Sequence, residues 1–123
     1  MPAGGEVPIA SSGEEQRKTE RALLIVQVEF KAAGDYTLGR SQDISEGGLR
    51  VLTPETVEAG SGVIVRFNLP PYTPGVLIES PGLVVRVQPA SGMGIEFLQL
   101  TEQQRQAIVR YVRQTVAGEE APR

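Results

Sequence analysis

The sequence predicts a mostly β protein: a small barrel or sandwich of antiparallel strands, followed by one α-helix. Short apolar segments recur at regular spacing through the middle of the chain, and Gly or Pro bounds most of them. Within several segments, apolar and polar residues alternate with the two-residue period of a half-buried strand. Only the C-terminal segment changes to the spacing of an amphipathic helix. The 123 residues are the length of a single domain with one core.

Seven strands are expected from this pattern. The first alternates Val28 and Phe30 with the polar Glu29, so one face is apolar and the other is not. Residues 43–48 are expected to form a turn after the second strand, and residues 80–82 to separate the fifth strand from the sixth. In chain order, the expected strands are residues 22–30, 36–42, 49–53, 63–69, 76–79, 83–88 and 93–98.

A helix over residues 102–117 is expected to end the domain. Thr101 and Gln104 have the spacing of a capping box, and Gly118 is expected to stop the helix. Apolar and small side chains recur at helical spacing, at Ile108, Tyr111, Val112, Thr115 and Val116. We expect this stripe to cover one opening of the barrel and complete the core; a groove for a partner is the alternative.

Composition excludes several classes of function. The chain has neither cysteine nor histidine, so it lacks disulfides, thiol nucleophiles, the commonest general base and the commonest transition-metal ligand. No visible cluster of carboxylates or lysines replaces them, so neither an enzyme nor a metal site is expected. A net charge of -3 argues against electrostatic binding to long nucleic acid. No run is long enough for membrane insertion and no signal peptide is visible, so a cytoplasmic location is expected.

The most informative stretch is the expected turn Asp43-Ile44-Ser45-Glu46-Gly47-Gly48. Its polar side chains donate and accept hydrogen bonds, and its paired glycines allow positive φ and close approach of a ligand. Arg17 and Arg21 precede the first strand and could fold back over this turn. Arginine matches phosphate oxygens and the O6/N7 edge of guanine, and a carboxylate accepts from guanine N–H groups. This chemistry permits an anionic, guanine-containing ligand without selecting it.

Two short motifs resemble the paired signature of the PilZ domain. The first is Arg17-x-x-x-Arg21, and the second, after two expected strands, is Asp43-x-Ser45-x-x-Gly48. That family comprises receptors for the bacterial second messenger cyclic di-GMP. Each half of the signature fixes only two or three positions, whereas both halves in this order are fairly specific.

The similarity extends beyond the signature. Residues 82–87 and 92–97 resemble later strands of the family, and the closing helix also matches, so the similarity runs from about Arg17 to Val116. The resemblance implies the PilZ split barrel, a six-stranded antiparallel β-barrel with a C-terminal α-helix. This implied fold agrees with the mostly β pattern and the C-terminal helix, although the pattern divides the chain into seven strands and the implied barrel has six.

The resemblance also implies a ligand site. Arg17 and Arg21 would bind phosphate and guanine edges. Asp43 and Ser45 would contact guanine and backbone polar atoms, and Gly48 would keep the turn open. Gln16 stands where many members of the family have another arginine, and Arg86 stands where they often have an aromatic residue. The resemblance therefore leaves open whether one or two ligand molecules bind. Additional candidate ligand-binding residues are Gln16, Lys18, Arg40, Gly47 and Arg86, of which Arg40 and Arg86 are candidates for stacking on a base.

The implied function is that of a non-enzymatic cyclic di-GMP receptor without a cofactor. Residues 1–16 are rich in Gly, Pro, Ser and Glu and are expected to form a flexible arm, before a domain at 17–117 and a tail at 118–123. Ligand contacts to the arginines would order the arm and present a new surface to a downstream partner protein. Regulation of motility or biofilm formation is the expected context.

Two other binding functions compete. A PilZ-fold adaptor could bind a protein partner without nucleotide; the intact Arg17, Arg21, Asp43 and Ser45 favour the receptor instead. A barrel for single-stranded nucleic acid would need exposed aromatic residues and positive charge, but the chain has three Phe, three Tyr and a net negative charge.

Overall fold

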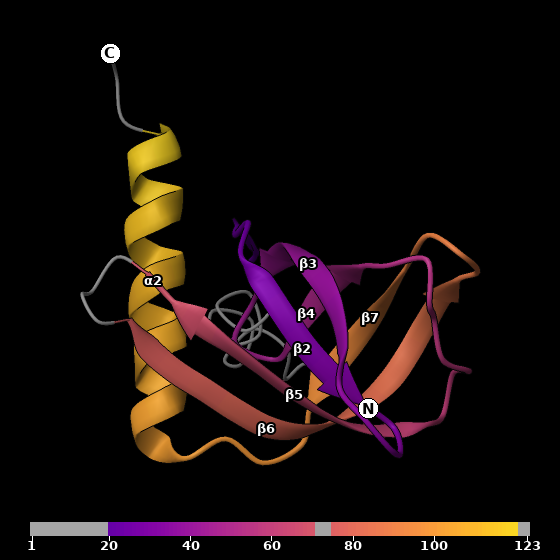
Figure 1. Cartoon of the computed structure of the whole chain (residues 1–123). Coiled ribbons are helices and arrows are strands. Elements are labelled where there is room, and N and C mark those ends of the chain that lie inside the picture. The colour runs from indigo at the N-terminus through magenta and orange to yellow at the C-terminus, as the bar shows by residue number, and fades with distance from the viewer. Residues whose placement is uncertain (1–19, 71–74, 121–123) are drawn as a thin grey trace, which may run out of the picture.

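The computed structural model describes residues 20–70 and 75–120, and within them the mostly β architecture is confirmed (Figure 1). The elements are β1 (Ala22–Leu23), β2 (Gln27–Lys31), β3 (Thr37–Ile44), β4 (Gly48–Leu52), β5 (Gly62–Leu69), β6 (Val76–Gln88), β7 (Gly92–Phe97) and α2 (Glu102–Glu120). No helix in this part of the chain is long and apolar enough to cross a membrane.

The barrel closes because β3 and β4 pair with each other as well as with other strands. The strands follow the order β3-β2-β5-β6-β7-β4, and the β3–β4 pairing completes an antiparallel ring of six. β1 is an additional strand that pairs with the end of β3, where Ala22 lies opposite Ile44. The predicted six-stranded barrel with a C-terminal helix is therefore confirmed, with one short strand added.

The core lies inside the barrel and extends to the helix. Alternate residues of each strand face inward, as the sequence pattern predicted; along β5, for example, Val63, Val65 and Phe67 are buried. α2 stands at one end of the barrel in Figure 1, and its Ile108 and Val112 join the same apolar cluster. The expectation that the helix completes the core is confirmed.

The start of α2 agrees with prediction, but its end does not. The backbone N–H of Thr101 donates to Gln104 Oε1, and the N–H of Gln104 donates to Thr101 Oγ1, both at 3.0 Å, which is a capping box. The predicted stop at Gly118 is wrong, because the helix continues to Glu120. Glycine costs about 1 kcal/mol in a helix but does not forbid it.

The predicted strand at residues 22–30 is split into β1 and β2 by the side chain of Ser41. The Ser41 hydroxyl accepts the N–H of Val26 at 2.9 Å and donates to the carbonyl of Leu24 at 2.5 Å. A side chain thus replaces part of the backbone ladder there. The alternation of apolar residues continues across the break, which is why the pattern did not reveal it.

The predicted strands 76–79 and 83–88 are one strand, β6. Ser80-Pro81-Gly82 was expected to interrupt it, but these residues continue the pairing with β5. Pro81 is tolerated because β7 begins to pair with β6 only at Gly82.

We predict that Ser41→Ala lowers stability by about 1–3 kcal/mol, because it leaves the partly buried N–H of Val26 and the carbonyl of Leu24 without the hydroxyl of the buried Ser41. Ser80→Ala is the matched control. Ser80 is buried to the same 1% exposure, but its hydroxyl only donates, and the carbonyl of Pro81 keeps the amide of Leu98. Urea denaturation should show the larger loss for Ser41→Ala; equal losses would contradict this account of the split strand.

Candidate functional site

The turn singled out in the sequence is a tight hairpin between β3 and β4. Ser45 N–H donates to the carbonyl of Gly48 at 2.9 Å, and the reverse bond measures 3.4 Å. Only Glu46 and Gly47 remain as the loop, so the prediction of a turn over residues 43–48 is too long. Asp43 belongs to β3 and Gly48 to β4, because barrel closure extends the β3–β4 ladder up to the hairpin.

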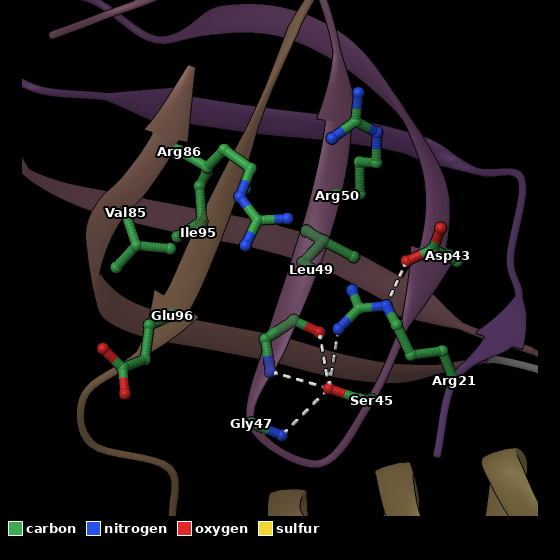
Figure 2. Close-up of a pocket in the computed structure, with 12 residues that line it drawn as sticks. Arg21, Asp43, Ser45, Gly47, Leu49, Arg50, Val85, Arg86, Ile95 and Glu96 are labelled. Carbon is green, nitrogen blue, oxygen red and sulfur yellow. Dashed lines mark hydrogen bonds and ion pairs between the residues drawn. The ribbon is translucent and has the colours of Figure 1, made fainter. Parts of the chain in front are cut away.

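The Ser45 side chain organises this hairpin from within. Ser45 is 2% exposed, and its hydroxyl oxygen accepts the backbone N–H groups of Gly47 and Gly48, both at 3.2 Å. The same oxygen accepts a bond from Arg21 Nη1 at 3.1 Å (Figure 2). The hydroxyl therefore supports the turn and fixes the arginine at once.

Arg21 folds back over the hairpin, as the sequence predicted. Its Nε donates to Asp43 Oδ1 at 2.5 Å, and the two side chains are 42% and 27% exposed. The two halves of the sequence signature therefore meet through Arg21, Asp43 and Ser45. The other predicted residues of the first half, Gln16, Arg17 and Lys18, lie outside the described residues, as does the predicted arm at 1–16.

Gly48 is required by packing. A Cβ atom at this position would lie 2.5 Å from the carbonyl oxygen of Ile95 on β7, closer than real contacts allow. Gly47 is different, since its Cβ would meet no atom within 4 Å. Neither glycine has positive φ, so close approach, and not backbone conformation, explains the pair.

A pocket of about 530 Å³ opens beside the hairpin, on the outer face of β4, β7 and β6. Figure 2 shows Arg21, Asp43 and Ser45 on one side of it and Arg86 on the other. Its lining comprises Arg21, Asp43, Ser45, Gly47, Gly48, Leu49, Arg50, Val85, Arg86, Gly94, Ile95 and Glu96. Predicted residues on three strands (β3, β4 and β6), in the hairpin and directly before β1 are thus brought to one cavity.

Arg40, a predicted candidate, does not line this pocket. It lies beside a separate groove of about 490 Å³ with the exposed side chains of Ile25 and Leu38. Conversely, Arg50, Gly94 and Glu96 line the pocket although the sequence did not single them out. Strand alternation could have placed Arg50 on the outward face, but it carries no information on which strands are neighbours.

The pocket lining carries excess positive charge. Three arginines face two carboxylates, those of Asp43 and Glu96. Arg50 is held by neutral partners: its Nε donates to Gln42 Oε1 at 2.8 Å, and its Nη2 donates to Gln88 Oε1. A flat, anionic ligand suits this arrangement, because guanidinium groups bind phosphate oxygens and also stack on aromatic rings. The described residues contain no group of three or more His, Cys, Asp or Glu that could hold a metal ion.

The hairpin is also tied to the helix. Glu46, with a side chain 13% exposed, accepts a bond from Arg105 Nη1 at 3.1 Å, and Arg105 also contacts Glu102. The hydrogen bond to Glu102, followed by the one to Glu46, raises the pKa of Arg105. The hydrogen bond from Arg105 in turn lowers the pKa of Glu102. The loop of the hairpin therefore rests on the first turn of α2.

Comparison with known proteins shows relatives of the same fold. A family model described as the PilZ domain matches residues 15–114. The Bacillus subtilis inhibitor of motility, MotI/DgrA, is similar with a TM-score of 0.75 and 18% identity, over 82% of this chain and 51% of that chain. Borreliella burgdorferi PlzA, solved in complex with c-di-GMP, has a TM-score of 0.62 and 19% identity, over 91% of this chain and 50% of that chain.

A third similar structure is the PilZ domain of CeSA from a cellulose-synthesizing bacterium, with a TM-score of 0.58 and 23% identity, over 78% of this chain and 97% of that one. The chain spans about half the length of the MotI and PlzA structures that it matches. A comparison with curated protein sequences finds no significant match.

The closed six-stranded barrel with a C-terminal helix defines a small β-barrel domain, with an arginine-lined pocket beside its Ser-Gly hairpin. Because the family model covers most of its length, the chain belongs to the PilZ domain family. The family resemblance inferred from the signature is confirmed.

We predict opposite outcomes for alanine at the two glycines of the hairpin. Gly48→Ala should lower stability by about 1–3 kcal/mol, because its Cβ would force β4 away from the carbonyl of Ile95. Gly47→Ala, which meets open space, should change stability by less than about 0.5 kcal/mol. Urea denaturation of both variants compares them directly. Equal stability of the two would mean that the hairpin adapts and that Gly48 is not a packing requirement.

Proposed function

We propose that this chain is a cyclic di-GMP receptor, and not an enzyme, that signals through its N-terminal segment to a partner protein. The observation that carries the proposal is the contact of Arg21 with Asp43 and Ser45 at the edge of the pocket. Residues far apart in the sequence converge there, and their chemistry complements a guanine nucleotide. In PlzA, a relative with the same fold, cyclic di-GMP is bound.

Each side chain has a distinct part in the proposed site. Arg21, together with Arg17, binds phosphate oxygens and the guanine edge, because guanidinium donors match both. Asp43 accepts from guanine N1–H and N2–H. Ser45 is buried, so it supports binding mainly by holding Arg21 and the hairpin in place. Gly48 contributes by letting β4 lie close to β7, which shapes the pocket wall.

Signalling follows from an exchange of partners. Without ligand, Arg21 is engaged by Asp43. A phosphate that binds Arg21 and a guanine that binds Asp43 replace this ion pair with contacts to the ligand. Arg21 lies directly before β1, so the exchange reaches the segment that precedes it, residues 1–16, whose changed conformation then signals to the partner. A role in motility or biofilm regulation, in the cytoplasm, belongs to this proposal.

A second candidate function is that of an adaptor that binds a protein without nucleotide. The observation in its favour is the groove beside Arg40, where Ile25 and Leu38 are 58% and 57% exposed. Exposed apolar side chains that gather at a groove are typical of protein interaction surfaces. The receptor remains the first proposal, because the groove accounts for none of the signature residues.

We predict that the purified protein binds cyclic di-GMP with micromolar or tighter affinity, equivalent to about 8 kcal/mol or more. GTP and cyclic di-AMP should give no binding heat at the same concentrations. Calorimetric titration measures affinity and also whether one or two ligands bind. Absence of heat at saturating cyclic di-GMP would refute the receptor and favour the adaptor.

Within the same titration, Arg21→Ala should bind about ten- to a hundredfold more weakly, because a charge-assisted contact is lost. Arg40→Ala is the matched control and should bind like the wild type, since Arg40 lies beside the other groove. Thermal melts of Arg21→Ala should stay near the wild type, because an exposed ion pair contributes about 0–1 kcal/mol. A melting temperature far below wild type would make Arg21 a structural residue instead.

We predict that the ligand protects the N-terminal segment from trypsin. Cleavage after Arg17, Lys18 and Arg21 requires an accessible, extended backbone, and ligand contacts to the arginines should remove that access. Limited digestion with and without cyclic di-GMP, followed by mass spectrometry, measures this. Cyclic di-AMP is the control and should not protect. Equal cleavage with and without cyclic di-GMP would show that this segment is not the switch.

A further inference from the structure

A second concave surface lies on the outer face of β2, β3 and β4. Gln27, Arg40 and Leu52 stand opposite one another across these three strands. They belong to the groove of about 490 Å³, which shares no lining residue with the pocket beside the hairpin. The apolar side chains of this groove come from Ile25, Val26, Leu38, Leu52 and Pro54.

Several of these apolar side chains are left outside the core. Ile25 and Leu38 are more than half exposed, and Leu52 is 38% exposed. Leu23 is also exposed and points to the same side as Ile25, because Leu24 between them is buried. An exposed apolar row therefore leads from β1, near the first described residue, to the groove. A contiguous apolar surface of this kind is typical of a face that another segment covers.

Arg40 is the one charged side chain that lines the groove, and its charge is not compensated. None of the residues that the structure describes forms a hydrogen bond or an ion pair with it. Outward arginines of neighbouring strands differ, since two glutamines hold Arg50 and Glu29 holds Arg66. The groove therefore suits an occupant that carries apolar side chains next to a carboxylate.

The sequence before β1 contains such a segment. Within residues 1–19, Val7 and Ile9 are the β-branched aliphatic residues, and Glu6 stands directly before them. Pro8 favours an extended backbone at the residue that precedes it. In an extended segment the side chains at positions 7 and 9 point to the same side. Two apolar side chains and an adjacent carboxylate thus match the apolar walls of the groove and Arg40.

The connection is long enough for this segment to reach the groove. Residues 10–19 span at most about 35 Å when extended, and the described chain begins at Glu20. From Ala22 to Ile25 the chain advances only about 10 Å along the sheet. A tether of this length gives an effective concentration on the order of millimolar, so a contact through a few side chains is populated.

We propose that residues 6–9 dock in the groove of β2, β3 and β4. Val7 and Ile9 pack on the exposed Ile25 and Leu38, and the Glu6 carboxylate pairs with Arg40. The docked segment covers an apolar face that a partner protein would otherwise meet, and it gives the N-terminal segment a defined place on the barrel. This inference goes beyond the proposed function and does not depend on it, because no nucleotide takes part.

Disulfide trapping tests the docking, because the chain has no cysteine of its own. In the full chain, Val7→Cys with Leu38→Cys should form an intramolecular disulfide at least about tenfold faster than Val7→Cys with Leu98→Cys. Leu98 is the matched control, since it is 56% exposed, like Leu38, and lies outside the groove. Peptide mass spectrometry after oxidation by oxidised glutathione, at micromolar protein, measures both rates. Equal rates would overturn the docking.

The second test examines the assigned side chains within the Val7→Cys/Leu38→Cys protein. Ile9→Asp should lower the trapping rate to that of the control pair, because it brings a charge into an apolar groove. Glu6→Arg should lower the rate by about two- to fivefold, and adding Arg40→Glu should restore it by re-forming an exposed ion pair. An unchanged rate in Ile9→Asp would overturn the docked segment. Failure of the charge reversal to restore the rate would overturn the pairing of Glu6 with Arg40.

A second copy of the chain is the alternative occupant, and the same experiment detects it. Disulfides between two chains, at a rate that rises with protein concentration, would overturn docking within one chain. These outcomes are also distinguishable from failure of the proposed function, because trapping is measured without nucleotide. Absence of cyclic di-GMP binding would overturn the receptor and leave the docking standing. Equal trapping rates with normal cyclic di-GMP binding would remove the docking alone.

Discussion

The close contact between β4 and β7 at Gly48 is the constraint on which the rest of the structure depends. Closure requires β4 to pair with β7 on one side and with β3 on the other, and a two-residue loop has to join β3 to β4. A side chain at Gly48 would collide with the carbonyl of Ile95, so glycine makes this closure sterically feasible. Ser45 is then buried inside the hairpin, where its oxygen reaches two backbone amides and Arg21. The signature residues Ser45 and Gly48 therefore have a structural role in barrel closure, in addition to any contact with a ligand.

The two sides of the pocket differ in how firmly the fold holds them. The hairpin side is fixed by the Phe97 amide, which donates to the carbonyl of Gly47, and by the ion pair of Glu46 with Arg105 on α2. The Arg21 side depends on β1, a strand of two residues, and on the Tyr111 hydroxyl, which donates to the carbonyl of Leu23. Short strands with few ladder bonds open more easily, so under the proposed function we expect any movement coupled to ligand binding on the Arg21 side.

Local geometry explains which features the sequence could predict. Strand alternation and helical spacing identified the inward side chains and the capping box, because both depend on residues near in sequence. They failed where contacts between distant residues determine the strand bounds. Ser41 breaks a strand through its hydrogen bond with Val26. Pro81 stays in β6 because the pairing of β6 with β7 starts only at the next residue, Gly82. The signature located one side of the pocket. The other side could not be predicted, because only barrel closure makes Arg50 a neighbour of Gly94.

The arginines of the pocket have two kinds of partner, and this difference decides what each contributes to binding. Arg21 is paired with a carboxylate, so a ligand phosphate that binds Arg21 replaces one charge-assisted bond with another. Arg50 is held by neutral amides, so a ligand adds an interaction there without removing an ion pair. Under the proposed function, Arg21 both binds the ligand and couples it to the N-terminal segment, whereas Arg50 can bind the ligand without breaking an ion pair. A substitution of Arg21 should then change affinity and signalling together, whereas a substitution of Arg50 should change affinity alone.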